Sequence, residues 1–377
     1  MRDNDSFRQQ TQAEHHTGRS ILERLPIDMV ACFSLDYMHL VCLGIMRKLL
    51  WTWIRGPLSV GCKRIRLGWR SVALISERLL ALVVHVACDF ARKPRSLKDL
   101  ARWKATELRQ FLLYTGPIVL KGIIDPEFYE HFMLLHTAIK ILIDKELYGE
   151  YNSYAYDLLL LFVQHAKVLY GVQFVSYNVH GVLHLPSAVL RNGPLDTFSL
   201  FEFENLLQDV KNMLRKHELP LQQIIRRLVE KERNVLIPTE KEEKAMFLTF
   251  KHISGPVIDA HQECVQFKLM NYQGWAFKTN NVSDCWAMLS DGKLVKVLNI
   301  VQSALGTSIV GNFFNPRLTT SLYETPLGSS CLGIYSVKTL SSVRSWPVEM
   351  IKCKLLVLPH KKDLFAVFPL WQYSKET

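Results

Sequence analysis

Two short stretches hold the acidic and imidazole side chains that are best placed for chemistry. Asp36 and His39 are three residues apart at the start of an expected helix, so both can face one way on its first turn, and Asp36 can cap that helix. Glu204 lies on another expected helix, with Lys211 and Arg215 further along the same polar face. That face could place a divalent metal at the acid and nucleic-acid phosphates at the cations. A solvated helix face with ordinary ion pairs is the alternative interpretation.

The elements around these residues follow from hydrophobic periodicity. The helix that carries Glu204 is expected over residues 195–216, after a turn at 192–194. Its apolar side chains recur at the helical period and predict a buried stripe of Phe203, Leu206, Leu207, Val210, Met213 and Leu214. The run at 29–35 is short, apolar and partly β-branched, which favours a buried strand directly before Asp36.

Between the two sites the pattern is helical, with helices expected at 97–114, 126–143 and 154–169. The first of these begins in the densest basic stretch of the chain, made of Arg92, Lys93, Arg95, Lys98, Arg102, Lys104 and Arg109. Trp103 lies among these cations, an arrangement compatible with nucleic-acid contact. The alternative is a solvated helix whose single Trp packs inward. An expected helix at 221–233 extends the basic surface with Arg226, Arg227, Lys231 and Arg233.

The composition changes after a charged linker, expected at 236–251. Residues 252–377 hold alternating segments separated by Gly, Pro and Asn, and Asp291-Gly292 predicts a hairpin turn. A small β-rich domain is therefore expected, for which a barrel is one fitting architecture, and no catalytic group of residues is visible in it. The predicted fold class is α+β, with a mainly helical N-terminal region followed by this domain.

The length, charge and cysteine content of the 377-residue chain limit the classes of protein to which it can belong. Two domains are expected, and a net charge of +11 with a pI near 9.2 favours anionic partners. The eight cysteines form no CxxC pair and most lie in apolar runs, which is typical of reduced, buried thiols in a nuclear or cytoplasmic protein. The polar N-terminus has no secretory h-region and no apolar run reaches the length of a membrane span, so neither secretion nor a membrane partner is expected.

Other metal and nucleophile patterns are weak. His180 and His184 are four residues apart without an intervening Glu, so buried, hydrogen-bonded histidines are favoured over a zinc site. A second set of zinc ligands would be His15, His16, Cys32, His39 and Cys42, but its spacing matches no standard zinc module. Candidates for Cys–His catalysis exist without a recognisable signature.

Four stretches in order, LDYMHLVCLGIMRKLL, RWKATELRQFLLYTGPIVL, YNVHGVLHL and FEFEN, carry a resemblance. Over about residues 2–235 the chain resembles transposase-derived proteins of the CACTA (En/Spm) type, cut-and-paste DNA transposases with an RNase H-like core. The resemblance implies that 1–44 is a remnant of that core with Asp36 and His39 as its Asp-x-x-His motif. It implies that 45–175 is a helical insertion and 176–235 the last core helices. Glu204 would be the third acid of the Asp-Asp-Glu triad, which holds two Mg²⁺ or Mn²⁺ ions, with Lys211 close to DNA.

The chain departs from this family where the first two catalytic aspartates are expected. Only 35 residues precede Asp36, too few for the strands that carry them. The expectation is therefore the C-terminal part of a transposase, without strand transfer and without the RNase H sheet that covers one side of the Glu204 helix. Glu204 alone is an incomplete metal site, so no cofactor is expected as the chain stands.

The expected partner is DNA, bound through Arg92, Lys93, Arg95, Arg102, Trp103, Lys104, Lys211, Arg215, Arg226 and Arg227. No small-molecule substrate is expected. One alternative is a non-catalytic scaffold protein that binds a protein partner through the β-rich domain. Another is a metal-dependent nuclease that uses Asp36 and Glu204 with a third local acid.

Overall fold

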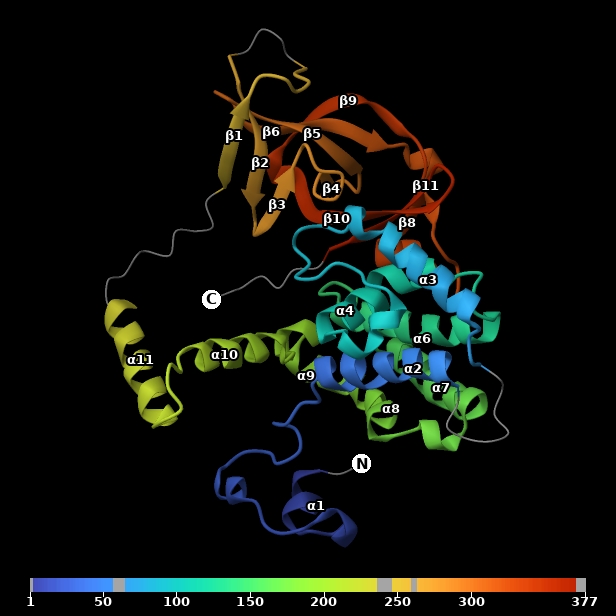
Figure 1. Ribbon diagram of the computed structural model, residues 1–377, viewed down its shortest axis with the longest axis vertical. Coiled ribbons are helices and arrows are strands. Elements are labelled where there is room, and N and C mark those ends of the chain that lie inside the picture. Colours follow the sequence, from blue (N-terminus) through green and yellow to red (C-terminus); the bar gives the residue numbers. More distant parts are fainter. Residues whose placement is uncertain (1–2, 57–64, 236–245, 259–262, 371–377) are drawn as a thin grey trace.

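The structure is a computed structural model that describes residues 3–56, 65–235, 246–258 and 263–370. A helical region lies below an antiparallel sheet in Figure 1, so the predicted α+β class is confirmed. Most of the expected charged linker falls outside the described residues, and its end belongs to the first strand, β1 (Phe247–His252).

The helical region is built around α6, whose residues 131–143 are all buried. Its predicted bounds, Pro126 and Ile143, are confirmed. Around it lie a π-helix (Met38–Met46), α2 (Arg47–Arg55), α3 (Trp69–Ala81), α4 (Ala105–Gln110), a second π-helical turn (Phe111–Thr115), α5 (Gly116–Val119), α7 (Asn152–Tyr170), α8 (Tyr177–Gly181) and α9 (Leu185–Asn192).

Aromatic side chains fill the core of this region. The ring of Phe132 on α6 lies edge-on to Trp53 of α2 at 6.3 Å and to Phe111 at 6.2 Å, both within the range of favourable aromatic pairs. The helices are therefore held mainly by burial of apolar surface, at roughly 25 cal/mol per Å².

Two predicted elements of the helical region are wrong. Residues 29–35 form turns and loop rather than a strand, with Cys32 and Phe33 exposed, and no strand pairs with them among the described residues. The expected helix at 97–114 is broken at Trp103, whose backbone is extended. A new helix starts there because the Glu107 carboxylate accepts the Lys104 backbone N–H at 2.9 Å.

The remaining strands are β2 (Val265–Tyr272), β3 (Trp275–Lys278), β4 (Trp286–Leu289), β5 (Leu294–Ser303), β6 (Gly306–Phe314), β7 (Thr320–Ser321), β8 (Tyr335–Val337), β9 (Leu340–Pro347), β10 (Ile351–Lys361) and β11 (Leu364–Pro369). They pair in the order β1-β2-β5-β4-β10-β11-β8-β7, with β3 beside β2 and β6 between β5 and β9. The predicted hairpin is confirmed, because Gly292 has a φ of +80° in the turn between the antiparallel strands β4 and β5.

The sheet branches at β5. β4 and then β2 pair along one edge of this strand, while β6 pairs along its length on the other edge. No pairing among the described strands returns to close a ring, so the barrel considered from the sequence is not formed.

The helical and β regions are joined by polar and aromatic contacts. His136 of α6 lies with its Nε2 2.8 Å from the Tyr323 hydroxyl, and both side chains are buried. The Tyr114 ring meets Phe368 of β11 at 5.9 Å, and the Tyr154 hydroxyl donates to the Pro326 carbonyl at 2.7 Å.

Two helices extend away from this body at its side, α10 (Phe201–Asn212) and α11 (Pro220–Val235) (Figure 1). Along the described parts of the chain, no helix is both long enough and apolar enough to cross a bilayer.

Candidate functional site

Asp36 fixes both the start of a helix and the orientation of His39. Its carboxylate accepts the backbone N–H groups of Met38 at 3.1 Å and His39 at 2.8 Å, as predicted for a helix cap. The same carboxylate lies 2.5 Å from Nδ1 of His39. Because an ionised carboxylate only accepts hydrogen bonds, Nδ1 carries the proton and Nε2 is left for other partners.

Asp36 also connects the two sequence-distant parts of the site. Its Oδ1 accepts the backbone N–H of Leu200 at 2.9 Å, directly before α10. This contact holds the start of α10 against the π-helix that carries His39. As a result, Nε2 of His39 lies 3.8 Å from Oε1 of Glu204. The structure therefore brings together the three predicted residues Asp36, His39 and Glu204.

The arrangement supports proton chemistry at His39. The imidazole is oriented by one carboxylate through Nδ1 and presents Nε2 beside a second carboxylate, and the side chains of His39 and Glu204 are about half exposed. An imidazole that is oriented by an acid on one nitrogen can take or give a proton at the other.

The same residues do not fit a divalent metal pair. A carboxylate has about four lone-pair positions, and Asp36 already accepts four hydrogen bonds, from three backbone N–H groups and the His39 ring. Of these three residues, only Glu204 has carboxylate oxygens available, whereas hard cations need several oxygen ligands. The chemistry that these three side chains can perform is therefore proton transfer and hydrogen bonding.

A buried ion pair lies beneath this site. Arg109 of α4 donates to Asp196 at 2.6 Å, and the Tyr37 and Cys42 side chains nearby are fully buried. Burial opposes the charge on Arg109, but the neighbouring Asp196 carboxylate raises its pKa, so the guanidinium stays charged. Burial raises the pKa of the Cys42 thiol to about 12, which makes it unreactive. Arg109 is therefore a structural residue and not part of a basic surface.

The basic stretch divides into occupied and free cations. Arg95 is held by Glu107 at 2.5 Å, and the Lys93 ammonium donates to the Val86 carbonyl. The exposed remainder, called here the basic segment, consists of Arg92, Lys98, Arg102 and Lys104. No ion pair engages their side chains within the described residues.

Trp103 is the clearest correction among the predicted DNA contacts. Its side chain is 2% exposed, its Nε1 donates to the Ser96 carbonyl at 3.3 Å, and its ring packs against Phe111. A ring that is buried in this way cannot stack on a base. The inward-packing alternative is the correct one because the extended backbone at this residue turns the indole into the core.

The Glu204 helix is shorter and less covered than predicted. Residues 195–198 form a separate 3₁₀ turn, and α10 ends at Asn212, so Arg215 lies beyond it. The predicted apolar stripe is largely in solvent, with Phe203 57% and Leu207 62% exposed. Of that stripe only Met213 is buried. The prediction that this stripe is buried is therefore wrong.

Lys211 and the α11 cations Arg226, Lys231 and Arg233 are exposed, while Arg227 is half-buried. Acidic residues lie between them. A cavity of about 380 Å³ between α10 and α11 is lined by Asp209 and Glu230 as well as by Arg227. These two helices therefore carry a mixed surface rather than a purely basic one.

The remaining histidine and cysteine predictions have mixed outcomes. His180 is exposed and His184 half-buried, with ring centroids 5.4 Å apart, so the predicted buried pair is wrong. Cys42, Cys285 and Cys353 are buried free thiols as expected, whereas the free thiols Cys32, Cys88 and Cys331 are exposed. No metal-binding group appears at the His16, Cys32 and Cys42 positions among the described residues.

One cluster was missed from the sequence. Ligand atoms of Cys88, Asp89 and Asp284 lie within 4.8 Å of one another, a spacing that could suit a metal ion. The ammonium of Lys354 already lies there, 2.5 Å from Asp89 and 2.8 Å from Asp284. It neutralises the carboxylates and joins β10 to the helical region. In the sequence, the only indication of this cluster was Lys354, a charged residue within the mainly apolar run 351–359.

Asp36→Ala is expected to lower the free energy of unfolding by about 2 kcal/mol, because the helix loses its cap and Leu200 loses its partner. Urea denaturation measures this change. Asp28→Ala is the matched control, since the exposed Asp28 caps a turn through Val30 and Ala31 without a hydrogen bond to a distant residue, and should lower the free energy of unfolding less. Equal losses in the two variants would contradict the connecting role of Asp36.

Residues 251–370 match a family described as a domain of unknown function (DUF8592), a range that nearly coincides with the described sheet. No curated protein and no solved structure matches the chain.

Proposed function

We propose that this protein descends from a CACTA-type DNA transposase and binds DNA without cleaving it. The main support for the proposal is that Nε2 of His39 lies 3.8 Å from Oε1 of Glu204, although the two residues are 165 positions apart in the chain. These two residues were selected from sequence motifs alone, as the histidine of an Asp-x-x-His motif and the third acid of a triad. Their proximity supports the ancestry implied by the ordered motifs.

The DNA-binding part of the proposal rests on the basic segment. Residues 90–110 hold seven Lys and Arg against Asp99 and Glu107, a local excess of five positive charges. Four of the seven are the exposed cations of the basic segment. α4, which follows this segment, packs against the π-helix that carries His39. Exposed cations that lack acidic partners are the groups that neutralise phosphates.

The non-catalytic part rests on the state of the carboxylates. Asp36 is saturated by four donors and Asp196 is engaged by Arg109, which leaves Glu204 as the free acid beside His39. A single carboxylate does not assemble the two-cation site that strand cleavage by this family requires. His39 and Glu204 then act through hydrogen bonding and charge rather than through metal chemistry.

Duplex DNA is expected to bind with a steep dependence on salt concentration. Replacing Arg92, Arg102 and Lys104 with Gln should reduce the slope of log K against log salt by about 2 to 3, because each lost phosphate contact contributes about 0.9. Fluorescence anisotropy at several salt concentrations measures the slope.

Lys167, Lys268 and Lys362 changed to Gln form the control, since they remove the same charge from exposed positions elsewhere. Equal slopes in the two triple variants would contradict a role for the basic segment. If no DNA binds near physiological salt, the exposed apolar face of α10 makes a protein partner the better explanation.

Addition of Mg²⁺ or Mn²⁺ to a nicked DNA substrate should give no cleavage. Cleavage that Glu204→Gln abolishes would contradict the proposal that the protein is non-catalytic.

A further inference from the structure

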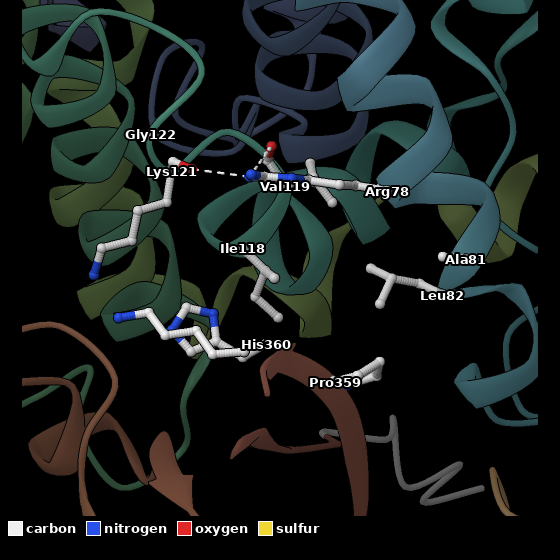
Figure 2. Close-up of a pocket in the computed structure, with 10 residues that line it drawn as sticks. Arg78, Ala81, Leu82, Ile118, Val119, Lys121, Gly122, Pro359 and His360 are labelled. Carbon is white, nitrogen blue, oxygen red and sulfur yellow. Dashed lines mark hydrogen bonds between the residues drawn. The ribbon is translucent and has the colours of Figure 1, made fainter. Parts of the chain in front are cut away.

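A cavity of about 540 Å³ lies between the helical region and the sheet. It is lined from three directions: by the end of α3, by the turn after α5 and by the end of β10 (Figure 2). Its volume falls within the range of about 300–1,000 Å³ that is typical of small-molecule sites. Leu82, Ile118 and Pro359 give it an apolar wall.

The charged side chains of the lining are all cationic. Arg78, Lys121 and Lys361 line this cavity together with His360, and no Asp or Glu is among its described lining residues. The guanidinium of Arg78 is held in place, since it donates to the Val119 carbonyl at 3.2 Å and to the Lys121 carbonyl at 2.9 Å. That anchoring orients the turn that carries Lys121.

The groups that line this cavity repel one another electrostatically. Burial, together with the facing charges of Lys121, Lys361 and Arg78, lowers the pKa of His360 to about 4. Burial and Lys361 also lower the pKa of Lys121. In addition, the buried Nδ1 of His360 has no hydrogen-bond partner in the described structure. Like charges and an unsatisfied ring nitrogen at one cavity are features that an anion would relieve.

We propose that this cavity binds a phosphate monoester with a compact apolar body, the chemical class that includes nucleoside monophosphates. The phosphate lies between Lys121 and Lys361, and the body packs against Leu82 and Ile118. Such binding is independent of DNA binding by the basic segment, and it adds a small-molecule ligand that the sequence did not predict.

The number of charges selects phosphate over carboxylate. A phosphate monoester carries about −1.5 to −2 charges near neutral pH and offers three strong acceptor oxygens, whereas a carboxylate carries one charge. The three cations Arg78, Lys121 and Lys361, together with the His360 imidazole, match the larger charge. The apolar wall excludes inorganic phosphate as the full ligand, because that ion would leave the wall uncovered.

Isothermal titration of the full chain with adenosine 5′-monophosphate tests the proposal. Adenosine, which lacks the charge, and inorganic phosphate, which lacks the body, should each bind about tenfold more weakly or worse. Lys121→Gln and Lys361→Gln should each weaken the nucleotide about tenfold, since each removes one charge-assisted contact. By NMR, the pKa of the His360 ring should rise when the nucleotide binds.

Lys362→Gln is the matched control, because Lys362 is exposed and next to Lys361 but does not line the cavity. Ala81→Trp, at an exposed rim position, should block the cavity without disturbing the fold, which circular dichroism checks. A 5′-phosphorylated oligonucleotide tests whether the phosphate belongs to a free nucleotide or to the end of a DNA strand. The ligand is a strand end if the oligonucleotide binds, the free nucleotide does not, and Lys121→Gln abolishes the binding. If neither binds, or if both lysine variants bind as well as Lys362→Gln, the proposal is wrong.

Discussion

Lys354→Met is expected to lower the free energy of unfolding by about 3–5 kcal/mol, the cost of leaving a buried charge without its partner. The side chains of Lys354 and Asp284 are fully buried. The ammonium donates to Asp89, to Asp284 and to the Ala276 carbonyl. Met has a similar volume, so the loss comes from charge and hydrogen bonding rather than from a cavity. Urea denaturation followed by circular dichroism measures it.

Lys352→Met is the control for this substitution. Lys352 lies two residues earlier on the same strand and pairs with Glu146 at 2.9 Å, but both side chains are substantially exposed. Surface pairs of this kind contribute about 0–1 kcal/mol. If Lys354→Met lowers the free energy of unfolding no more than Lys352→Met does, the stabilising role of the buried cluster is contradicted.

The pH dependence of the Lys354 variant has a definite sign. In the wild type, burial favours the neutral form of Asp284, but Lys354 and the Cys88 N–H lower its pKa overall. The resulting stability is present above the unfolded pKa and lost as the pH falls through the lowered one. Among the groups that lower this pKa, Lys354 has the largest effect, so the variant should have a higher Asp284 pKa than the wild type, although Lys278 remains 3.7 Å from this carboxylate. The deficit of the variant should therefore shrink between about pH 7 and about pH 5, and a constant deficit would contradict this account.

The parts of the fold that the sequence predicted depend on local patterns. The Asp36 cap involves residues two and three positions away, the turn at Asp291-Gly292 involves its own four residues, and α6 carries a long apolar pattern. Such features do not depend on distant packing. The approach of His39 to Glu204 was not predicted, because no local pattern determines which helices meet.

The failures share one physical cause, since the side of an element that faces the core is decided by distant neighbours. Trp103 lies among cations in the sequence, yet a broken helix turns its ring inward. The stripe at Phe203 has helical periodicity but no element covers it. Lys354 lies in an apolar strand because Asp284 and Asp89, which are 70 and 265 positions away, surround its ammonium. Periodicity cannot identify partners at such separations.

Lys140→Met is expected to raise the free energy of unfolding at neutral pH by about 1–4 kcal/mol, because it removes a buried charge that has no hydrogen-bond partner. Lys140 is 2% exposed in the last turn of α6, and its Nζ has no such partner within the described structure. The Tyr114 ring, 4.4 Å from Nζ, provides a cation–π contact that compensates only part of the desolvation. Asp144 and Asp196 act on the Lys140 charge through space, but neither forms an ion pair with it in the described structure, and Asp196 is already paired with Arg109.

The wild-type pH dependence provides an independent test of the same charge. Burial, reinforced by Arg109, lowers the pKa of Lys140 to about 7. Because the unfolded lysine keeps its proton up to about pH 10, the unfolded state binds more protons above pH 7. Stability should therefore rise with pH, by about 1–2 kcal/mol between pH 7 and 8.5. Measurements stop at 8.5 because the buried thiols of Cys42 and Cys353 oppose the trend at higher pH.

In Lys140→Met this rise should disappear, whereas the exposed Lys167→Met should retain it. Urea denaturation at several pH values measures both variants against the wild type. A variant that is less stable than the wild type at pH 7 would show that Lys140 has a partner strong enough to offset its burial. The same contradiction would follow if the pH slope survived the substitution, because no other described group has a pKa lowered to about 7. The two buried lysines thus have opposite roles: Lys354 stabilises the junction through paired carboxylates, and Lys140 destabilises α6 because its ammonium has no hydrogen-bond partner among the described residues.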